Sequence, residues 1–302
     1  MTTIVNPKEK QEMLTKAAVR GRSLWDDART RLMRNKAAVA SMFILGVLVV
    51  LAIIGQLGIW VHDYDTIYRD RVSIAPTLDN WHILGTDAQG RDLLARTLVG
   101  LGVSLMVGVV ATIVSLVIGV TWGATAGFVG GRIDQIMMRF VDILYSLPFI
   151  FFVIILMVVF GRNIVLIFVA IGAVEWLTMA RIVRGQTLAL AKMEFVEAAE
   201  AAGVSRGKII QRHIIPNVLG PVVVYVTLMI PVVVLAESFL SFLGLGVQEP
   251  LTSLGRLIST GAQDMEVAPW TLIVPAVTMM ITLFCLNFIG DGLRDAIDPK
   301  DR

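Results

Sequence analysis

The chain has 302 residues, of which 56% are hydrophobic and 17% are charged, and its mean hydropathy is +0.77. A soluble domain carries roughly 25% charged residues and cannot bury so much apolar surface, so these figures exclude an ordinary soluble protein and also intrinsic disorder. A net charge of +2 is too small for a nucleic-acid-binding protein, and the single cysteine, Cys285, excludes an intrachain disulfide. We therefore expect an all-α integral membrane protein.

Six apolar runs are long enough to cross a bilayer as helices, which takes about 17–25 residues each. They cover residues 37–61, 97–131, 143–161, 163–180, 214–242 and 267–290. Pro148 lies inside the third run and predicts a kink there. Gly119, Gly123 and Gly127 recur at every fourth position of the second run. Such spacing lets another helix approach closely, either within this chain or at a sliding or subunit-contacting surface.

Orientation follows from the basic residues. With the N-terminus in the cytoplasm, 20 of the 26 Lys and Arg residues fall in cytoplasmic segments and six in external loops. The positive-inside rule therefore places both termini in the cytoplasm. We expect a cytoplasmic N-terminal segment (1–36), a six-helix membrane domain (37–290) and a cytoplasmic tail (291–302), with an external segment at 62–96 and a cytoplasmic loop at 181–213.

The N-terminal segment contains one predicted helix. Ser23 and Asp26 are typical of a helix start, and the apolar residues that follow fall on one helical face. We expect this helix to lie at the cytoplasmic interface. The alternative is a solvated helix that leads into the first span.

Four polar features of the sequence remain open. Glu175 lies well inside the fourth run, where it either lines a polar path or pairs with another helix, because an ionised acid in hydrocarbon is costly. Glu237 is expected near the outer surface and is interpreted as an interfacial acid. Arg139 and Asp142 are spaced for an ion pair. The three histidines are scattered along the chain and show no metal-ligand spacing.

The cytoplasmic loop is the most informative stretch. Residues 194–202 are mainly good helix formers, Gly203 suits a helix stop, and Ser205 can cap a second helix. In that second helix Ile209, Ile210, His213 and Ile214 form an apolar face, and Pro216 marks the start of the fifth span. A short, alanine-rich helix has small side chains, so it can insert into a groove on a partner protein. The alternative is a helix pair that lies idle at the membrane surface.

This loop resembles the signature of bacterial ABC importer permeases. The family form is Glu-Ala-Ala, three residues, Gly, nine residues, then Ile-x-Leu-Pro, and Glu197, Ala198, Ala199, Gly203 and Pro216 match it. The chain departs from the form at two positions, where His213 replaces Ile and Ile215 replaces Leu. Five other stretches resemble the C-type permease subunits of oligopeptide and dipeptide importers, and those of oligopeptide importers most closely. They are residues 84–92, 138–148, 176–184, 237–246 and 287–299.

The resemblance implies a type I ABC importer permease fold in a multi-pass protein of the bacterial inner membrane. It also implies that the cytoplasmic loop is a coupling helix that docks on an ATPase subunit. The matched residues Glu197, Ala198, Ala199, Gly203 and Pro216 carry that role, and we add Phe195 and Ala202 from helical spacing. The implied partners are a homologous permease that completes a heterodimer, two cytoplasmic ABC ATPases, an external peptide-binding protein and the peptide substrate.

The chain itself is expected to be non-catalytic, with no cofactor or metal of its own. A phosphate-binding loop needs Gly-x-x-x-x-Gly-Lys-Ser/Thr, and Gly207-Lys208, the nearest candidate, is followed by Ile209. ATP and Mg²⁺ are therefore expected on the partner ATPases. The alternatives are the permease of a related dipeptide, nickel or glutathione importer, a proton-coupled secondary transporter that uses Glu175, and an intramembrane peptidase.

The external segment ends in a stretch with turn chemistry. Its notable residues are Gly85, Thr86, Asp87, Gly90, Arg91 and Asp92. One interpretation is a structural turn that fixes the start of the second span. The other is a contact surface for the binding protein that delivers the substrate.

Overall fold

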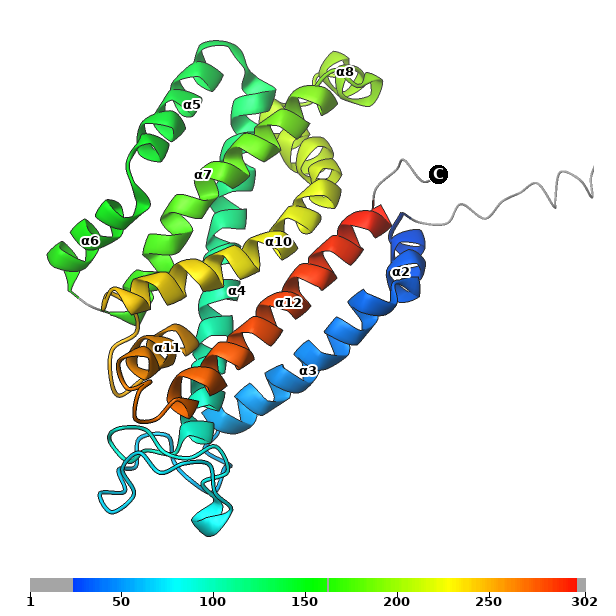
Figure 1. The fold of residues 1–302 in the computed structure, drawn as a ribbon. Coiled ribbons are helices and arrows are strands. Elements are labelled where there is room, and N and C mark those ends of the chain that lie inside the picture. The colour runs from blue at the N-terminus through cyan, green and yellow to red at the C-terminus, as the bar shows by residue number, and fades with distance from the viewer. Residues whose placement is uncertain (1–23, 162, 298–302) are drawn as a thin grey trace, which may run out of the picture.

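The computed structural model describes residues 24–161 and 163–297, and this part of the chain is helical without a β-strand (Figure 1). The elements are α2 (Leu24–Arg34), α3 (Lys36–Gln56), η1 (Asp79–Trp81), α4 (Leu93–Val129), α5 (Gly131–Ser146), α6 (Phe149–Phe160), α7 (Ile164–Leu190), α8 (Glu194–Ala201), α9 (Arg206–Ile209), η2 (Ile210–Ile214), α10 (Ile215–Phe242), α11 (Leu254–Gln263) and α12 (Trp270–Ile297). The all-α prediction is confirmed.

Within residues 24–161 and 163–297, five helical stretches are long and apolar enough to cross a membrane, and a sixth span exists if α5 and α6 count as one broken span. The five are α3, α4, α7, the continuous helix from Arg206 to Phe242, and α12. Between α5 and α6 the chain bends by 87°. The bend has a local cause, because Leu147 precedes Pro148 and takes extended backbone angles (φ −79°, ψ 129°). The kink predicted at Pro148 is therefore present, but the run 143–161 is not one straight helix.

The second span packs mainly against the fourth. A side-chain carbon added at Gly119, Gly123 or Gly127 of α4 would overlap atoms of α7, from Met179 to Thr187. The missing side chains let the two helix backbones approach closely. These three glycines of α4 thus serve packing within this chain rather than a contact with another subunit, and a sliding surface stays a prediction.

The main core lies among α4, α7 and α10 and extends to the loop after α7, where Val196, Ile209 and Ile214 are fully buried. In Figure 1, α8 and the C-terminal end of α4 lie at one end of the bundle, while the segment between α3 and α4 covers the opposite end. α2 packs beside the C-terminal end of α12. Two acids, Asp26 and Asp27, occupy the first turn of α2. Negative charge is favourable at this end because it complements the helix dipole. The predicted cap, Ser23, lies outside the described residues.

Candidate functional site

The candidate site is the helix pair α8–α9 together with Gly203 between them. α8 carries Glu194 and Glu197 in its first turn, where their charge complements the helix dipole. Its end is a two-bond stop: the Gly203 N–H donates to the Glu200 carbonyl (2.9 Å) and the Val204 N–H to the Ala199 carbonyl (3.1 Å). Gly203 has φ +78°, a left-handed conformation that glycine adopts without strain. The predicted helix stop is confirmed.

The second helix of the pair runs into the next span without a break. Ser205 is the N-cap residue of α9 as predicted, although its side chain makes no capping hydrogen bond. Pro216 lies in the first turn of α10 rather than at a new helix start. Proline has no N–H for the helical ladder, and the π-helical turn η2 precedes it, with the Ile215 N–H bonded to the Ile210 carbonyl. The pair is thereby joined rigidly to α10.

The inner face of the pair is apolar. Val196 from α8, Ile209 from α9 and Ile214 from η2 are each at most 1% exposed and belong to the main core. Ile210 packs against that core, while His213 is half-buried at its edge, with its ring 6.4 Å from the ring of Phe195. The predicted apolar face is thus confirmed for its three isoleucines. Three buried aliphatic side chains anchor the pair to the bundle.

The outer face of the pair is exposed. Six of the seven residues assigned to coupling are exposed, and Ala199 is half-buried: Phe195, Glu197, Ala198, Ala199, Ala202, Gly203 and Pro216. In the part of the chain that the structure describes, Glu197 has no side-chain hydrogen bond or ion pair. This face is therefore free to contact another molecule.

Two ion pairs connect α7, the helix that leads into α8, to α5. The Arg184 guanidinium donates from both Nε and Nη2 to the Asp134 carboxylate, at 2.5 and 2.6 Å. One turn away, Arg181 donates to Asp142 at 2.9 Å and lies over the Tyr145 ring, 4.1 Å from its centre. The four charged side chains of these pairs line a cavity of about 970 Å³.

The ion pair predicted between Arg139 and Asp142 is not formed. α5 packs beside α7, so Arg181 from the neighbouring helix takes Asp142. Arg139 remains exposed, with no ion pair among the described residues. The partner of Asp142 lies on α7, and sequence spacing within α5 could not reveal a contact with another helix.

The two membrane acids differ in their surroundings. Glu175 is half-buried in α7 and has no hydrogen bond or ion pair within the described residues, so a paired role has no contact to support it, and its place on a path stays a prediction. Glu237 is fully buried and accepts hydrogen bonds from Ser241 (2.7 Å) and Ser104 (3.3 Å). α4 and α10 enclose the carboxyl group and their serines satisfy it, so Glu237 is not exposed, and its depth near the outer surface stays a prediction.

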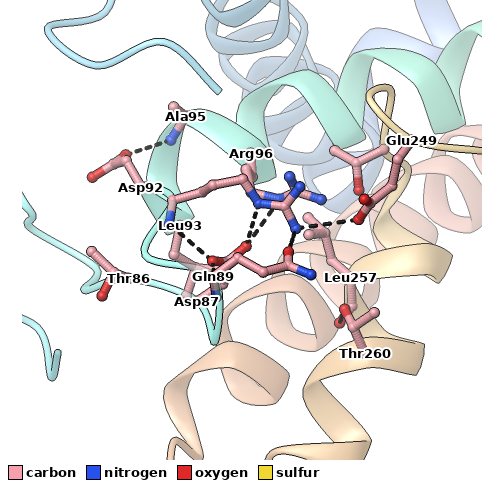
Figure 2. Close-up of polar contacts among 12 residues, drawn as sticks. Thr86, Asp87, Gln89, Asp92, Leu93, Ala95, Arg96, Glu249, Leu257 and Thr260 are labelled. Carbon is pink, nitrogen blue, oxygen red and sulfur yellow. Dashed lines mark hydrogen bonds and ion pairs between the residues drawn. The ribbon is translucent and has the colours of Figure 1, made fainter. Parts of the chain in front are cut away.

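The external turn is built around Asp87 (Figure 2). One Asp87 oxygen accepts the backbone N–H groups of Gln89 and Arg91, and the other accepts the Arg91 side chain, each at 2.9 Å. Arg96 lies 3.5 Å from the same carboxylate, and Arg91 also reaches Glu249 at 3.3 Å. The turn thus joins the start of α4 to the chain before α11.

Most of the predicted contact residues of this turn are not accessible. Gly85, Thr86, Gly90, Arg91 and Asp92 are buried and Asp87 is half-buried. The two glycines have φ near +80°, as the turn requires. This geometry supports the structural interpretation of the turn, and contact with a binding protein stays a prediction.

The histidines correct one expectation from the sequence. His62 and His82 are twenty positions apart, yet their rings stack with centres 4.3 Å apart, and Asp92 lies beside them. The external segment folds back on itself and brings them together. Spacing along the chain could not show this grouping.

Comparison with known proteins identifies relatives along the whole chain. Residues 119–302 match the family of the binding-protein-dependent transport system inner membrane component, and residues 23–76 match the N-terminal TM domain of oligopeptide transport permease C. The oligopeptide transport system permease protein OppC of Escherichia coli (strain K12) is 57% identical over 297 residues, covering 98% of each chain. OppC of Haemophilus influenzae is 55% identical, over 93% of this chain and 90% of the relative.

A solved structure gives the same fold. A chain of the inward-facing MetNI methionine ABC transporter superposes with a TM-score of 0.54 at 21% identity, over 68% of this chain and 96% of that chain. At this identity the likeness concerns the fold alone. It agrees with the importer permease architecture expected from the sequence.

Proposed function

We propose that this chain forms half of an oligopeptide path that is driven by ATPases on other polypeptides. The chain belongs to the inner membrane components of binding-protein-dependent transport systems, in the branch of oligopeptide permease C. Its helices and its relatives place it as a multi-pass protein of the bacterial inner membrane. As a permease subunit it is not itself the catalyst of ATP hydrolysis.

The observation that carries the proposal is the construction of the α8–α9 pair. A coupling element needs an exposed surface that a partner can hold and a stiff connection to the spans that move. The pair has both: an exposed outer face that includes Ala198 and Ala202, and an inner face anchored through Val196. The ATPase subunits, with their ATP and Mg²⁺, would hold the outer face.

The connections of the pair suggest how motion would spread. α7 ends at Leu190, three residues before α8, and α9 continues through η2 into α10. A displacement of the pair would therefore move two spans together. Arg181 and Arg184 of α7 would then pull on α5 through their ion pairs, so that three helices respond to one contact. This geometry suits rocking between inward-facing and outward-facing states.

The remaining partners follow from the family. A second, homologous permease would complete the path as a heterodimer, and an external peptide-binding protein would deliver the peptide. The cytoplasmic position of both termini and of residues 1–36 and 291–302 belongs to the same proposal. Glu175 is the acid that we assign to the path.

The proposal is tested by reconstitution into lipid vesicles. The full complex with ATP inside and loaded binding protein outside should accumulate a labelled peptide, and this chain alone should accumulate none. Uptake by the chain alone, or uptake by the complex without ATP, would contradict the proposal and favour a secondary transporter. Replacing Glu175 with Gln tests its place on the path, because normal uptake and folding of this variant would contradict any path role.

A further inference from the structure

The external segment contains a buried cluster of nitrogen and oxygen donors that the transport mechanism does not use. His62 is 6% exposed, and His82 and Asp92 are fully buried. One ring nitrogen of each histidine and one carboxylate oxygen of Asp92 lie within 4.8 Å of one another. The three residues follow α3, follow η1 and cap α4 respectively, so the cluster connects distant parts of the segment.

The hydrogen bonds of the cluster indicate which ring nitrogens carry protons. His62 Nε2 lies 2.8 Å from the carbonyl oxygen of Asn80, which can only accept, so Nε2 donates and Nδ1 keeps a lone pair. The Tyr68 hydroxyl lies 2.9 Å from that Nδ1. His82 Nδ1 lies 2.9 Å from the Asp92 carboxylate and donates to it. In the neutral ring the lone pair of His82 is then on Nε2.

His82 Nε2 is buried and has no hydrogen-bond partner within the described residues. A buried polar atom without a partner costs free energy, so its lone pair is available to a ligand. In metal sites a ligating histidine almost always donates its other ring N–H to a carboxylate or a backbone carbonyl. His82 does so to Asp92, and His62 does so to Asn80.

We propose that His62 and His82 form a binding site for a divalent transition-metal ion, with Asp92 orienting His82 and supplying negative charge beside it. Imidazole ligands favour ions of the zinc, copper and nickel type over magnesium or calcium. The rings stack with their planes 15° apart, so one ring tilts when both lone pairs converge on one ion. The Tyr68 hydroxyl lies beside the site and can move from its hydrogen bond with His62.

Such an ion would hold the external segment together. Apart from η1, residues 57–92 have no regular secondary structure, and with only one cysteine the chain cannot form an intrachain disulfide. Small units that lack a large core of their own commonly depend on a disulfide or a metal. An ion between His62 and His82 would join the end of α3 to the start of α4.

The small number of histidines and cysteines in the sequence makes metal binding easy to assign to particular residues. It has three histidines and one cysteine, so His213 and Cys285 are the matched controls outside the cluster. The full chain is purified in detergent with an affinity tag that contains no histidine. Zn²⁺ binding is measured by equilibrium dialysis, and Co²⁺ binding by its visible absorption bands. The same measurements are made on His62→Gln, His82→Gln, Asp92→Asn, His213→Gln and Cys285→Ser.

We expect one ion per chain in the wild type, in His213→Gln and in Cys285→Ser, and none in His62→Gln or His82→Gln. Asp92→Asn should weaken binding by about 10–100-fold, the usual effect of losing the partner of a ligating histidine. Added Zn²⁺ should raise the melting temperature of the wild type but not of the two cluster variants.

Three results would overturn the proposal. One is the absence of stoichiometric binding by the wild type, which would leave a hydrogen-bonded histidine stack only. Another is undiminished binding in His62→Gln, which remains informative if His82→Gln fails to fold. The third is loss of binding in His213→Gln or Cys285→Ser, which would place the ion elsewhere.

Discussion

The two ends of the molecule are built in opposite ways. Most residues of the α8–α9 pair are exposed, and buried apolar side chains such as Val196 and Ile209 anchor it to the bundle. The external segment buries its polar groups instead: Asp92, His82 and Thr86 are fully enclosed and bonded to one another or to the backbone. One end is left open for a partner, and the other is fixed by its own contacts.

This difference predicts that mutations at the two ends will have different effects. Breaking a buried polar contact leaves a group without a partner and costs about 1–3 kcal/mol, so changes in the external segment should lower the stability of the protein. Changes on the exposed face of α8 remove little that the fold needs. They should leave the protein folded and reduce coupling.

The largest effect on stability is expected for Asp92→Ala. Asp92 caps α4 by accepting the Ala95 N–H at 2.7 Å and also accepts from His82. Loss of the cap costs about 0.5–2 kcal/mol, and the unpaired His82 adds about 1–3 kcal/mol. The melting temperature of the purified protein should fall clearly, while Asp92→Asn, which keeps an oxygen acceptor for the Ala95 N–H but presents an NH2 group to His82, should fall less. Equal melting temperatures for Asp92→Ala and the wild type would contradict the rigid external end.

A smaller loss of stability is expected for Arg184→Ala, near the C-terminal end of α7. It leaves the buried Asp134 carboxylate without the two hydrogen bonds from Arg184, at a cost of about 1–3 kcal/mol. The ATPase rate of the complex should also respond less to peptide-loaded binding protein. Arg139→Ala, which removes an exposed arginine of the same cavity, is the control and should change neither quantity. Identical behaviour of the two variants would show that the α5–α7 ion pairs carry no signal.

The third change tests the open end alone. Ala198→Asp places a charge on the exposed face of α8, where it should disturb docking by at least about 1.4 kcal/mol and so reduce peptide uptake roughly tenfold. The melting temperature should not change, and Ala198→Ser should transport normally. Normal uptake by the aspartate variant would argue that this face meets no partner.

The smallest effect is expected from a pair of glycines. Gly203→Ala forces a left-handed conformation on alanine and should destabilise the pair by about 1–2 kcal/mol. Gly207→Ala, in α9 with open space around it, should be neutral or slightly stabilising. Uptake and melting temperature of both variants provide the measurement. A reversed order would mean that Gly203 does not set the geometry of the pair.

Features that depend on neighbours in the sequence were predictable. Run length gave the spans, and the chemistry of Gly203 and Ser205 gave the helix pair with its boundary. Features that depend on a contact between distant segments were not. Asp142 bonds to Arg181 from another helix, and Glu237 is buried by serines of which one, Ser104, lies 133 positions away. A single apolar run also could not show that α5 and α6 meet at 87°, because hydropathy carries no information about direction.

The measurement that tests the central claim most directly is a disulfide crosslink between α8 and an ATPase subunit. Cys285→Ser removes the only native thiol, and Ala201→Cys places one at the exposed end of α8. In membranes that contain the full complex, with single cysteines placed in the ATPase, Ala201→Cys should crosslink to it, and the yield should change when ATP is added. A cysteine at exposed Gln89, at the opposite end, should give no such product. Failure to crosslink at Ala201 and at every other position from Phe195 to Ala202 would contradict the claim that this helix pair is where the ATPase acts.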